Sequence, residues 1–170
     1  MGREIDEQII KYLTDAHAME MQSIAVLEKG IEIAGDLTLA QLCRGHLNDS
    51  RDHERYVKQR LEALDESPSK LKNLGGQVAA KGLGLLAQGM PDTPAKLMAV
   101  AYAFEHFEIA SYTLLRKVAE RAEDQETISM CDRILPVEQQ AAELIEQNLD
   151  LALERSLEAV GVIEQTGPHA

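Results

Sequence analysis

The stretch Ala103–Tyr112, Ala-Phe-Glu-His-Phe-Glu-Ile-Ala-Ser-Tyr, constrains this chain more than any other. Its apolar residues recur at helical spacing, and Glu105 and Glu108 lie one turn apart on the same apolar face. An ionised carboxylate on the core-facing side of a helix is destabilising unless another group pairs with it. The fold therefore has to bring partners for these two acids from other parts of the chain.

The chain is long enough to form one domain with a full core, because its 170 residues are close to the usual size of a single domain. Hydrophobic residues make up 45% of the sequence and aromatic residues only 4%, so the apolar content is mainly aliphatic. This composition favours an all-α fold over disorder. We expect one domain over residues 1–164 and a flexible C-terminal tail over residues 165–170.

The formal net charge of −12 argues against nucleic acid as a partner, because phosphate binding needs clustered Lys and Arg. It argues equally against binding to an anionic membrane surface. The sequence has no N-terminal apolar segment and no long apolar span, so we expect a cytoplasmic protein. Cys43 and Cys131 lack the spacing of a metal or disulfide framework and are expected to be buried core residues.

Four long helices are predicted from the spacing of the apolar residues. They cover approximately residues 4–34, 38–65, 94–121 and 125–160. The connections at Gly35 and at Glu123–Asp124 are so short that the helices they join have to be antiparallel neighbours. Pro136 lies inside the last helix and should kink it or divide it.

The segment between residues 67 and 94 differs in composition from the predicted helices. Ser67–Ser69 and Pro91–Pro94 are breaks, and five of the eleven glycines of the chain lie between them. Leucine and valine still repeat here at roughly helical spacing, which predicts a short extra helix. We interpret the segment as a glycine-rich crossover that joins two helical hairpins of an antiparallel four-helix bundle.

Acids and histidines interrupt the apolar stripe near the middle of each predicted long helix. They are Glu20, His46, Asp49, His53, Glu105, Glu108 and Glu138. In an antiparallel bundle these mid-helix positions come to roughly one level, and such a set of carboxylates and imidazoles suits paired iron or manganese ions. His17 and His106 lie about a quarter-turn or more off the stripes and are not expected to be ligands.

Each of these residues also has an ordinary structural explanation. Glu20 can be a boundary residue with its carboxylate in solvent, and Glu138 can be an acid favoured near a helix start. Asp49 and His53 can form a hydrogen-bonded pair within one helix, and His46 is more often a satisfied core histidine than a ligand. Their joint occurrence on four helices is what favours a metal, because a cation would remove the desolvation cost of the buried acids.

The segment 105–112, Glu-His-Phe-Glu-Ile-Ala-Ser-Tyr, resembles the Glu-His-Tyr-Glu-Ile-Ala-x-Tyr motif of the YciF/YciE-like family within the ferritin-like superfamily. Residues 15–22 and 46–53 are similar to shorter motifs of that family, and Glu138 matches its carboxylate on the fourth helix. The resemblance spans roughly residues 5–155. It implies a ferritin-like four-helix bundle with an extra helix, homodimers, and an association with bacterial stress responses.

In metal-binding ferritin-like proteins, each half of the site contributes a Glu and a Glu-x-x-His. The resemblance therefore implies that this chain holds metal through Glu20, His53, Glu105, Glu108 and Glu138, with Asp49 as an additional candidate. Ser50 stands where the Glu of the first Glu-x-x-His is expected, and Ala141 stands where the second His is expected. These departures predict a weaker, single-ion or altered two-ion site and leave any enzymatic activity open.

Two functions are therefore compatible with the sequence. In the first, the protein binds one or two ions of iron or manganese, or of zinc, and handles metal or peroxide during stress. In the second, it is a non-enzymatic dimeric or self-assembling stress protein with a vestigial site. We expect a homodimer or a higher homo-oligomer in both cases. Tyr112 is expected to be a core residue, with hydrogen bonding to a ligand or oxidation as the alternative.

Overall fold

The structure of the protein, a computed structural model, describes residues 2–64 and 93–163. Within these ranges the chain forms five α-helices and no strand, which confirms the all-α prediction. The helices are α1 (Gly2–Ile33), α2 (Leu37–Ala63), α4 (Pro94–Arg121), α5 (Gln125–Gln147) and α6 (Leu149–Ala159). The short helix predicted in the crossover and the C-terminal tail lie outside the described residues.

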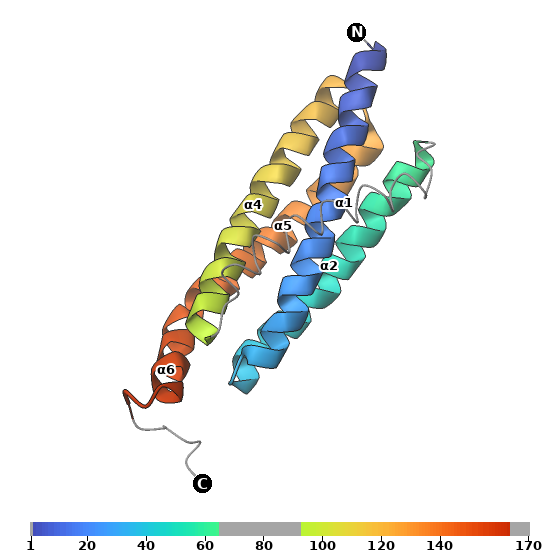
Figure 1. Cartoon of the computed structure of the whole chain (residues 1–170). Helices are drawn as coiled ribbons and strands as arrows, with labels where there is room; N and C mark the ends of the chain where they lie inside the picture. The colour runs from blue at the N-terminus through green and yellow to red at the C-terminus, as the bar shows by residue number, and fades with distance from the viewer. Residues whose placement is uncertain (1, 65–92, 164–170) are drawn as a thin grey trace.

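The helices form the predicted ferritin-like arrangement of two antiparallel hairpins, α1 with α2 and α4 with α5 (Figure 1). Helix α1 packs against α2 and α4, and α5 packs against α4 and α2, while α6 packs mainly against α4. Helices α2 and α4 run in the same direction, as expected for two hairpins joined by a crossover (Figure 1). Across the part of the chain that the structure describes, no helix has the length and hydropathy to cross a membrane.

The two tight connections have the local chemistry that their residues predict. Gly35 has a φ of +65°, a left-handed conformation that glycine adopts without strain. Asp36 follows it and caps α2 by accepting hydrogen bonds from two backbone N–H groups of the first turn. Asp124 caps α5 in the same way, through the N–H of Thr127 at 3.0 Å. Each cap fixes the point at which a hairpin turns back.

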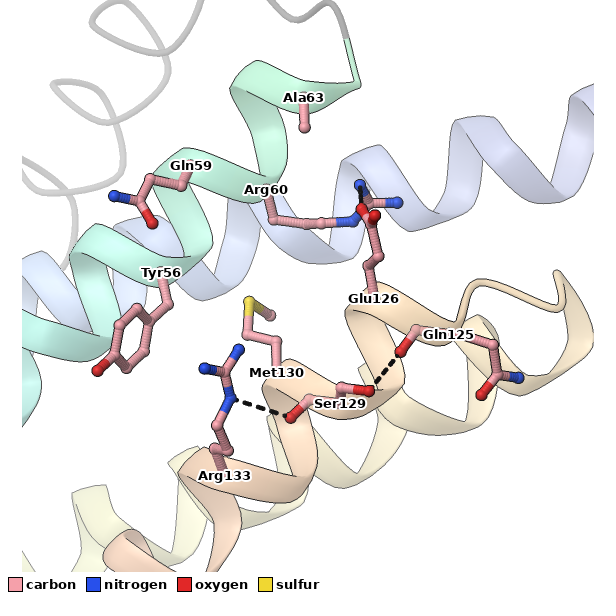
Figure 2. Close-up of a pocket in the computed structure, with 9 residues that line it drawn as sticks. All are labelled: Tyr56, Gln59, Arg60, Ala63, Gln125, Glu126, Ser129, Met130 and Arg133. Carbon is pink, nitrogen blue, oxygen red and sulfur yellow. Dashed lines mark hydrogen bonds and ion pairs between the residues drawn. The ribbon is translucent and has the colours of Figure 1, made fainter.

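Arg60 joins the end of α2 to the start of α5. Its guanidinium donates hydrogen bonds to Thr127 Oγ1 at 2.9 Å, to Glu126 at 2.6 Å and to Asp124 at 2.8 Å. Figure 2 shows Arg60 and Glu126 among the residues that line a cavity of about 500 Å³ between the two helices. The fork of hydrogen bonds sets the register of α2 against α5 at this end of the bundle.

The helix predicted over residues 125–160 is divided, but at Asn148 and not at the proline. The Asn148 side-chain amide donates to the carbonyl oxygen of Leu144 at 2.8 Å, and this competition for a backbone group ends α5. Pro136 lies inside α5. The helix tolerates it because Pro136 and Asp132, whose carbonyl oxygen loses its helical partner, are both exposed to water.

The core consists of two apolar clusters, one toward each end of the bundle, with a polar layer between them. The first cluster takes one leucine or isoleucine from each long helix in Leu13, Leu61, Leu115 and Ile134. The second does so in Leu27, Leu39, Leu97 and Ile145. The polar layer is buried and consists of Glu20, Ser23, His46, Ser50, His53, Glu105, Glu108 and Glu138. The polar residues that interrupt the apolar stripe of each long helix are therefore buried, and those of the four helices lie together in one layer.

Two helical glycines should respond differently to substitution by alanine. Gly45 is exposed within α2 and an added Cβ would meet nothing within 4 Å, so Gly45→Ala should raise the free energy of unfolding by about 0.5–1 kcal/mol. At Gly30 an added Cβ would meet Cys43 Sγ at 3.1 Å and Leu97 at 3.3 Å. Gly30→Ala should therefore gain less stability or lose some. Urea denaturation measures both, and equal gains would contradict the close packing at Gly30.

Candidate metal centre

Five of the six predicted ligand residues lie together in the polar layer. These residues are at most 4% exposed, and they come from all four long helices. They are Glu20 of α1, His53 of α2, Glu105 and Glu108 of α4, and Glu138 of α5. Because Glu20 and Glu138 are both 0% exposed, neither is a boundary residue with its carboxylate in solvent.

The side chains form two groups that have one residue in common. The first group is His46, Glu105, Glu108 and Glu138, and the second is Glu20, His53 and Glu138. In each group every residue offers a nitrogen or oxygen atom, and these atoms lie within 4.8 Å of one another. Two ligand atoms at about 2.2 Å from one ion are at most about 4.4 Å apart, so each group needs only a small contraction to close on an ion.

Glu138 takes part in the two groups through different oxygen atoms. Its Oε1 lies 2.7 Å from His53 Nδ1, and its Oε2 lies 3.4 Å from His46 Nε2. The two histidines belong to different groups. Glu138 would therefore be able to contact an ion in either group, with one histidine available in each.

The close atoms do not satisfy one another as hydrogen-bond partners. Nine buried side-chain nitrogen and oxygen atoms lack a hydrogen-bond partner over residues 2–64 and 93–163, and all nine belong to the residues of these two groups. His46 Nε2, for example, lies 3.0 Å from Glu105 Oε2 without hydrogen-bond geometry. Buried polar atoms are almost always paired. Their concentration in this one layer gives a set of donor atoms that could hold a cation.

The electrostatics of the layer lead to the same conclusion. Burial raises the pKa of Glu20 and of Glu108 well above their ordinary value, and neighbouring carboxylates raise it further. Burial also raises the pKa of Glu105, although His46 opposes the change. Burial alone would lower the pKa of His46, but the Glu105 and Glu138 carboxylates outweigh it and raise that pKa. The raised pKa values show that burial and mutual repulsion oppose ionisation of Glu20, Glu105 and Glu108, and a nearby cation would favour it.

His46 is the residue of this site that the sequence interpretation did not favour. It was expected more often to be a satisfied core histidine than a ligand, and the structure places it in the first group, with its Nε2 3.0 Å from Glu105 Oε2. Its distance of seven residues from His53 places the two on one face of α2, and that spacing was the available indication. What the sequence did not contain is the position of Glu105 opposite this face.

Three other positions are set apart from the ligand groups. Asp49 is exposed and belongs to neither group. Ser50 is buried with its Oγ 3.4 Å from Ser23 Oγ, and Ala141 is buried without a donor atom. His46 adds a donor that the resemblance did not imply, and it lies in the same group as Glu105, Glu108 and Glu138.

Residues expected to lie outside the site do so. His17 is buried and its Nε2 forms a hydrogen bond with Glu54 at 2.7 Å, whereas His106 is exposed. Cys43 and Cys131 are buried in the apolar clusters, as predicted. Burial raises the pKa of their thiols to about 11 and about 12, so that both remain protonated at neutral pH.

Tyr112 is a fully buried core residue, as predicted, and it also contacts the site. Its hydroxyl donates a hydrogen bond to Glu20 Oε1 at 2.5 Å. The bond fixes the direction of the Glu20 carboxylate and leaves Oε2 of that carboxylate without a partner. Tyr112 therefore orients one proposed ligand.

Tyr112→Phe should weaken metal binding without removing any ligand. Loss of the hydroxyl frees the Glu20 carboxylate to turn, and loss of such an orienting hydrogen bond typically lowers metal affinity about 10–100-fold. Competition with a chelator of known affinity measures the change. Tyr102→Phe is the matched control, because Tyr102 is half-buried and stacks edge-on against His106, outside the site. Equal affinities of the two variants would contradict the orienting role.

Comparison with known proteins places the chain in a family. Residues 4–158 match a family described as a domain of unknown function, DUF892. Protein YciF of Escherichia coli (strain K12) is 29% identical over 126 residues, which cover 70% of this chain and 74% of YciF.

Two crystal structures show a similar fold. A protein from Xanthomonas campestris pv. campestris has a TM-score of 0.75 and 26% identity, and the match covers 92% of this chain and 98% of that chain. The E. coli stress protein YciF has a TM-score of 0.66 and 23% identity, with 89% and 96% covered. The match over nearly the whole chain, together with the helical fold and the motif at Glu105–Tyr112, shows that the protein belongs to the DUF892 family of YciF-like proteins.

Proposed function

We propose that this protein binds two ions of iron or manganese at the centre of the bundle and handles metal or peroxide during stress. The observation that carries the proposal is Glu138, whose two carboxylate oxygens lie close to two histidines of two different groups. The unpartnered polar atoms around it fit a pair of cations, which would satisfy them and compensate their charge.

The two groups assign the ligands. His46, Glu105 and Glu108 would hold one ion, Glu20 and His53 would hold the other, and Glu138 would contact both. Carboxylate and imidazole donors suit iron and manganese, with zinc as the alternative. A redox-active ion in such a site supplies one-electron chemistry toward dioxygen or peroxide. The chain's own residues hold and orient the ions, and the apolar clusters on both sides exclude bulk water.

The stress role is supported by the relative that is described as a stress protein, YciF of E. coli. The candidate site is compatible with a stress role. Iron or manganese bound with open coordination positions can react with peroxide, and binding alone can store the metal. The proposed class is therefore a metal-binding stress protein.

Metal titration of the purified, metal-free protein tests the proposal. Anaerobic addition of Fe²⁺ or of Mn²⁺ should end at two ions per chain, and free metal at about 100 times its dissociation constant should raise stability by about 2.7 kcal/mol. Elemental analysis and thermal melts give the two values. Metal content far below one ion per chain, with no shift in the melting temperature, would overturn the proposal.

A second candidate, assembly into a dimer or larger oligomer, is favoured by the outer face of α4. Phe107 and Leu114 lie seven residues apart and are 58% and 51% exposed, so two large apolar side chains share one exposed face. We propose that this face pairs two copies of the chain. Light scattering of the parent protein and of Phe107→Glu tests it, and the same monomeric mass for both would exclude this interface.

A further inference from the structure

A cavity of about 250 Å³ opens between α2 and α5, beside the candidate metal centre. Its most buried lining residues are His46 and Ala141, which are 5% and 6% exposed. The exposed residues of its lining are Gln41, Gly45, Asp49, Gln140 and Leu144. The cavity therefore leads from solvent at its rim to a residue of the ligand cluster at its base.

His46 separates this cavity from the cluster. His46 is one of the residues that line the cavity, and its Nε2 lies 3.0 Å from Glu105 and 3.4 Å from Glu138. These two carboxylates are its ion-pair partners, and neither ring nitrogen has a contact of full hydrogen-bond geometry with a described residue. Rotation of this one side chain would join the cavity to the atoms of the first ligand group.

Small residues keep the cavity open on both helices. Ala141 lies one turn after Glu138 on α5, and Gly45 directly precedes His46 on α2. A Cβ at Gly45 would meet nothing within 4 Å, so the space beside it is unfilled. A glycine inside a helix lowers its stability, and here it leaves the rim unobstructed.

The charge of the rim suits a cation. Asp49 is an exposed carboxylate at this rim, and the chain carries a formal net charge of −12. Carboxylate oxygens are the hard donors that hydrated divalent ions accept first. Two larger cavities, of about 500 and 510 Å³, lie around Arg60 at the end of the bundle, and Figure 2 shows the first of them. No residue of the two candidate ligand groups lines either cavity.

We propose that the cavity between α2 and α5 is the route by which divalent cations reach the metal centre, with Asp49 as the first ligand they meet and His46 as the side chain that turns to admit them. The inference rests on the proposed function, because it requires a centre that binds metal. It gives Asp49 a role in uptake, whereas the sequence interpretation placed it among the final ligands.

Closing the rim tests the route through the rate of metal uptake. Gly45→Phe adds a ring to the unfilled space at the rim, and it should slow uptake of Mn²⁺ by about tenfold or more. The final Mn²⁺ content should stay at the parental value, because no proposed ligand changes. Gly45→Ala is the matched control and should keep the parental rate. Stopped-flow mixing of metal-free protein with Mn²⁺ and a fluorescent chelator follows the rate, and circular dichroism verifies the fold.

Removing the charge at the rim is an independent test. Asp49→Asn should slow Mn²⁺ uptake by about twofold or more at low salt and less at high salt, because local charge raises the cation concentration at the rim. Glu143→Gln is the control, since Glu143 is exposed on α5, does not line the cavity and carries the same charge.

The possible outcomes of these two experiments distinguish a failure of the proposed uptake route from a failure of the proposed metal centre. Parental uptake rates in both Gly45→Phe and Asp49→Asn, with full final Mn²⁺ content, would overturn the route and leave the metal centre intact. A parent protein that binds no Mn²⁺ would overturn the centre, and the route with it. Slower uptake in both variants, with unchanged content and unchanged controls, supports the route.

Discussion

Glu138→Gln should reduce the bound metal from about two ions per chain to about none after dialysis, because it removes the carboxylate that belongs to both ligand groups. The amide keeps the size of the side chain but offers one neutral oxygen where two charged oxygens were needed. Glu20→Gln removes a ligand of the second group alone, so it should leave the ion of the first group in place. Elemental analysis of dialysed protein gives the number of ions per chain.

The control for this experiment is Glu143→Gln, which makes the same chemical change at an exposed position of the same helix. It should retain the parental metal content. If Glu138→Gln kept one ion per chain, Glu138 would be a ligand of a single ion and the two groups would be independent. Circular dichroism verifies that each variant keeps its helices.

The metal-free protein should lose stability as the pH rises above about 4.5, and bound metal should reverse this dependence. The pKa values of Glu20 and Glu108 are raised well above 4.5 in the folded chain. Above pH 4.5 the unfolded chain releases these protons while the folded chain keeps them. Stability then falls by about 1.4 kcal/mol per pH unit for each such proton, until the pH passes the folded pKa.

The other shifted groups do not cancel this effect. The raised pKa of His46 acts in the same direction as the pH rises above 6.5, because the folded chain also keeps that proton longer. Burial opposes ionisation of Asp36 and Asp124, but hydrogen bonds outweigh it and lower their pKa values below 3.8. Their stabilisation is present above pH 3.8 and is lost only in more acidic solution.

Urea denaturation at pH 5 and pH 8, with a chelator and with saturating Mn²⁺, measures the reversal. The chelated protein should be less stable at pH 8, and the Mn²⁺-loaded protein should be more stable there, because the metal competes with protons for the same ligands. Glu108→Gln should flatten the dependence of the chelated protein. A chelated protein that gains stability from pH 5 to pH 8 would show that the buried acids already have partners.

Local rules were enough to predict the four long helical regions and most residues of the polar layer, although Asp49 is exposed and Ser23 was not predicted. The caps at Asp36 and Asp124 and the acid pair of α4 each depend on residues a few positions apart. The role of His46 depends on Glu105 lying across the bundle, and such contacts between helices are set by packing, which a single sequence does not specify. The sequence interpretation expected Pro136 to kink or divide this helix. The helix instead ends before Asn148, where the side-chain amide donates a hydrogen bond to the backbone carbonyl of Leu144.

The division of the core into two apolar clusters has a consequence for how such bundles can diversify. Each cluster takes side chains from all four long helices, so each end of the bundle is held together without contributions from the polar layer. Substitutions in the polar layer could then change its affinity or selectivity for a metal while the apolar clusters keep the four long helices packed together. Ser50 and Ala141 depart from the usual ligand pattern, yet the four long helices still bring their buried acids and histidines together in one layer.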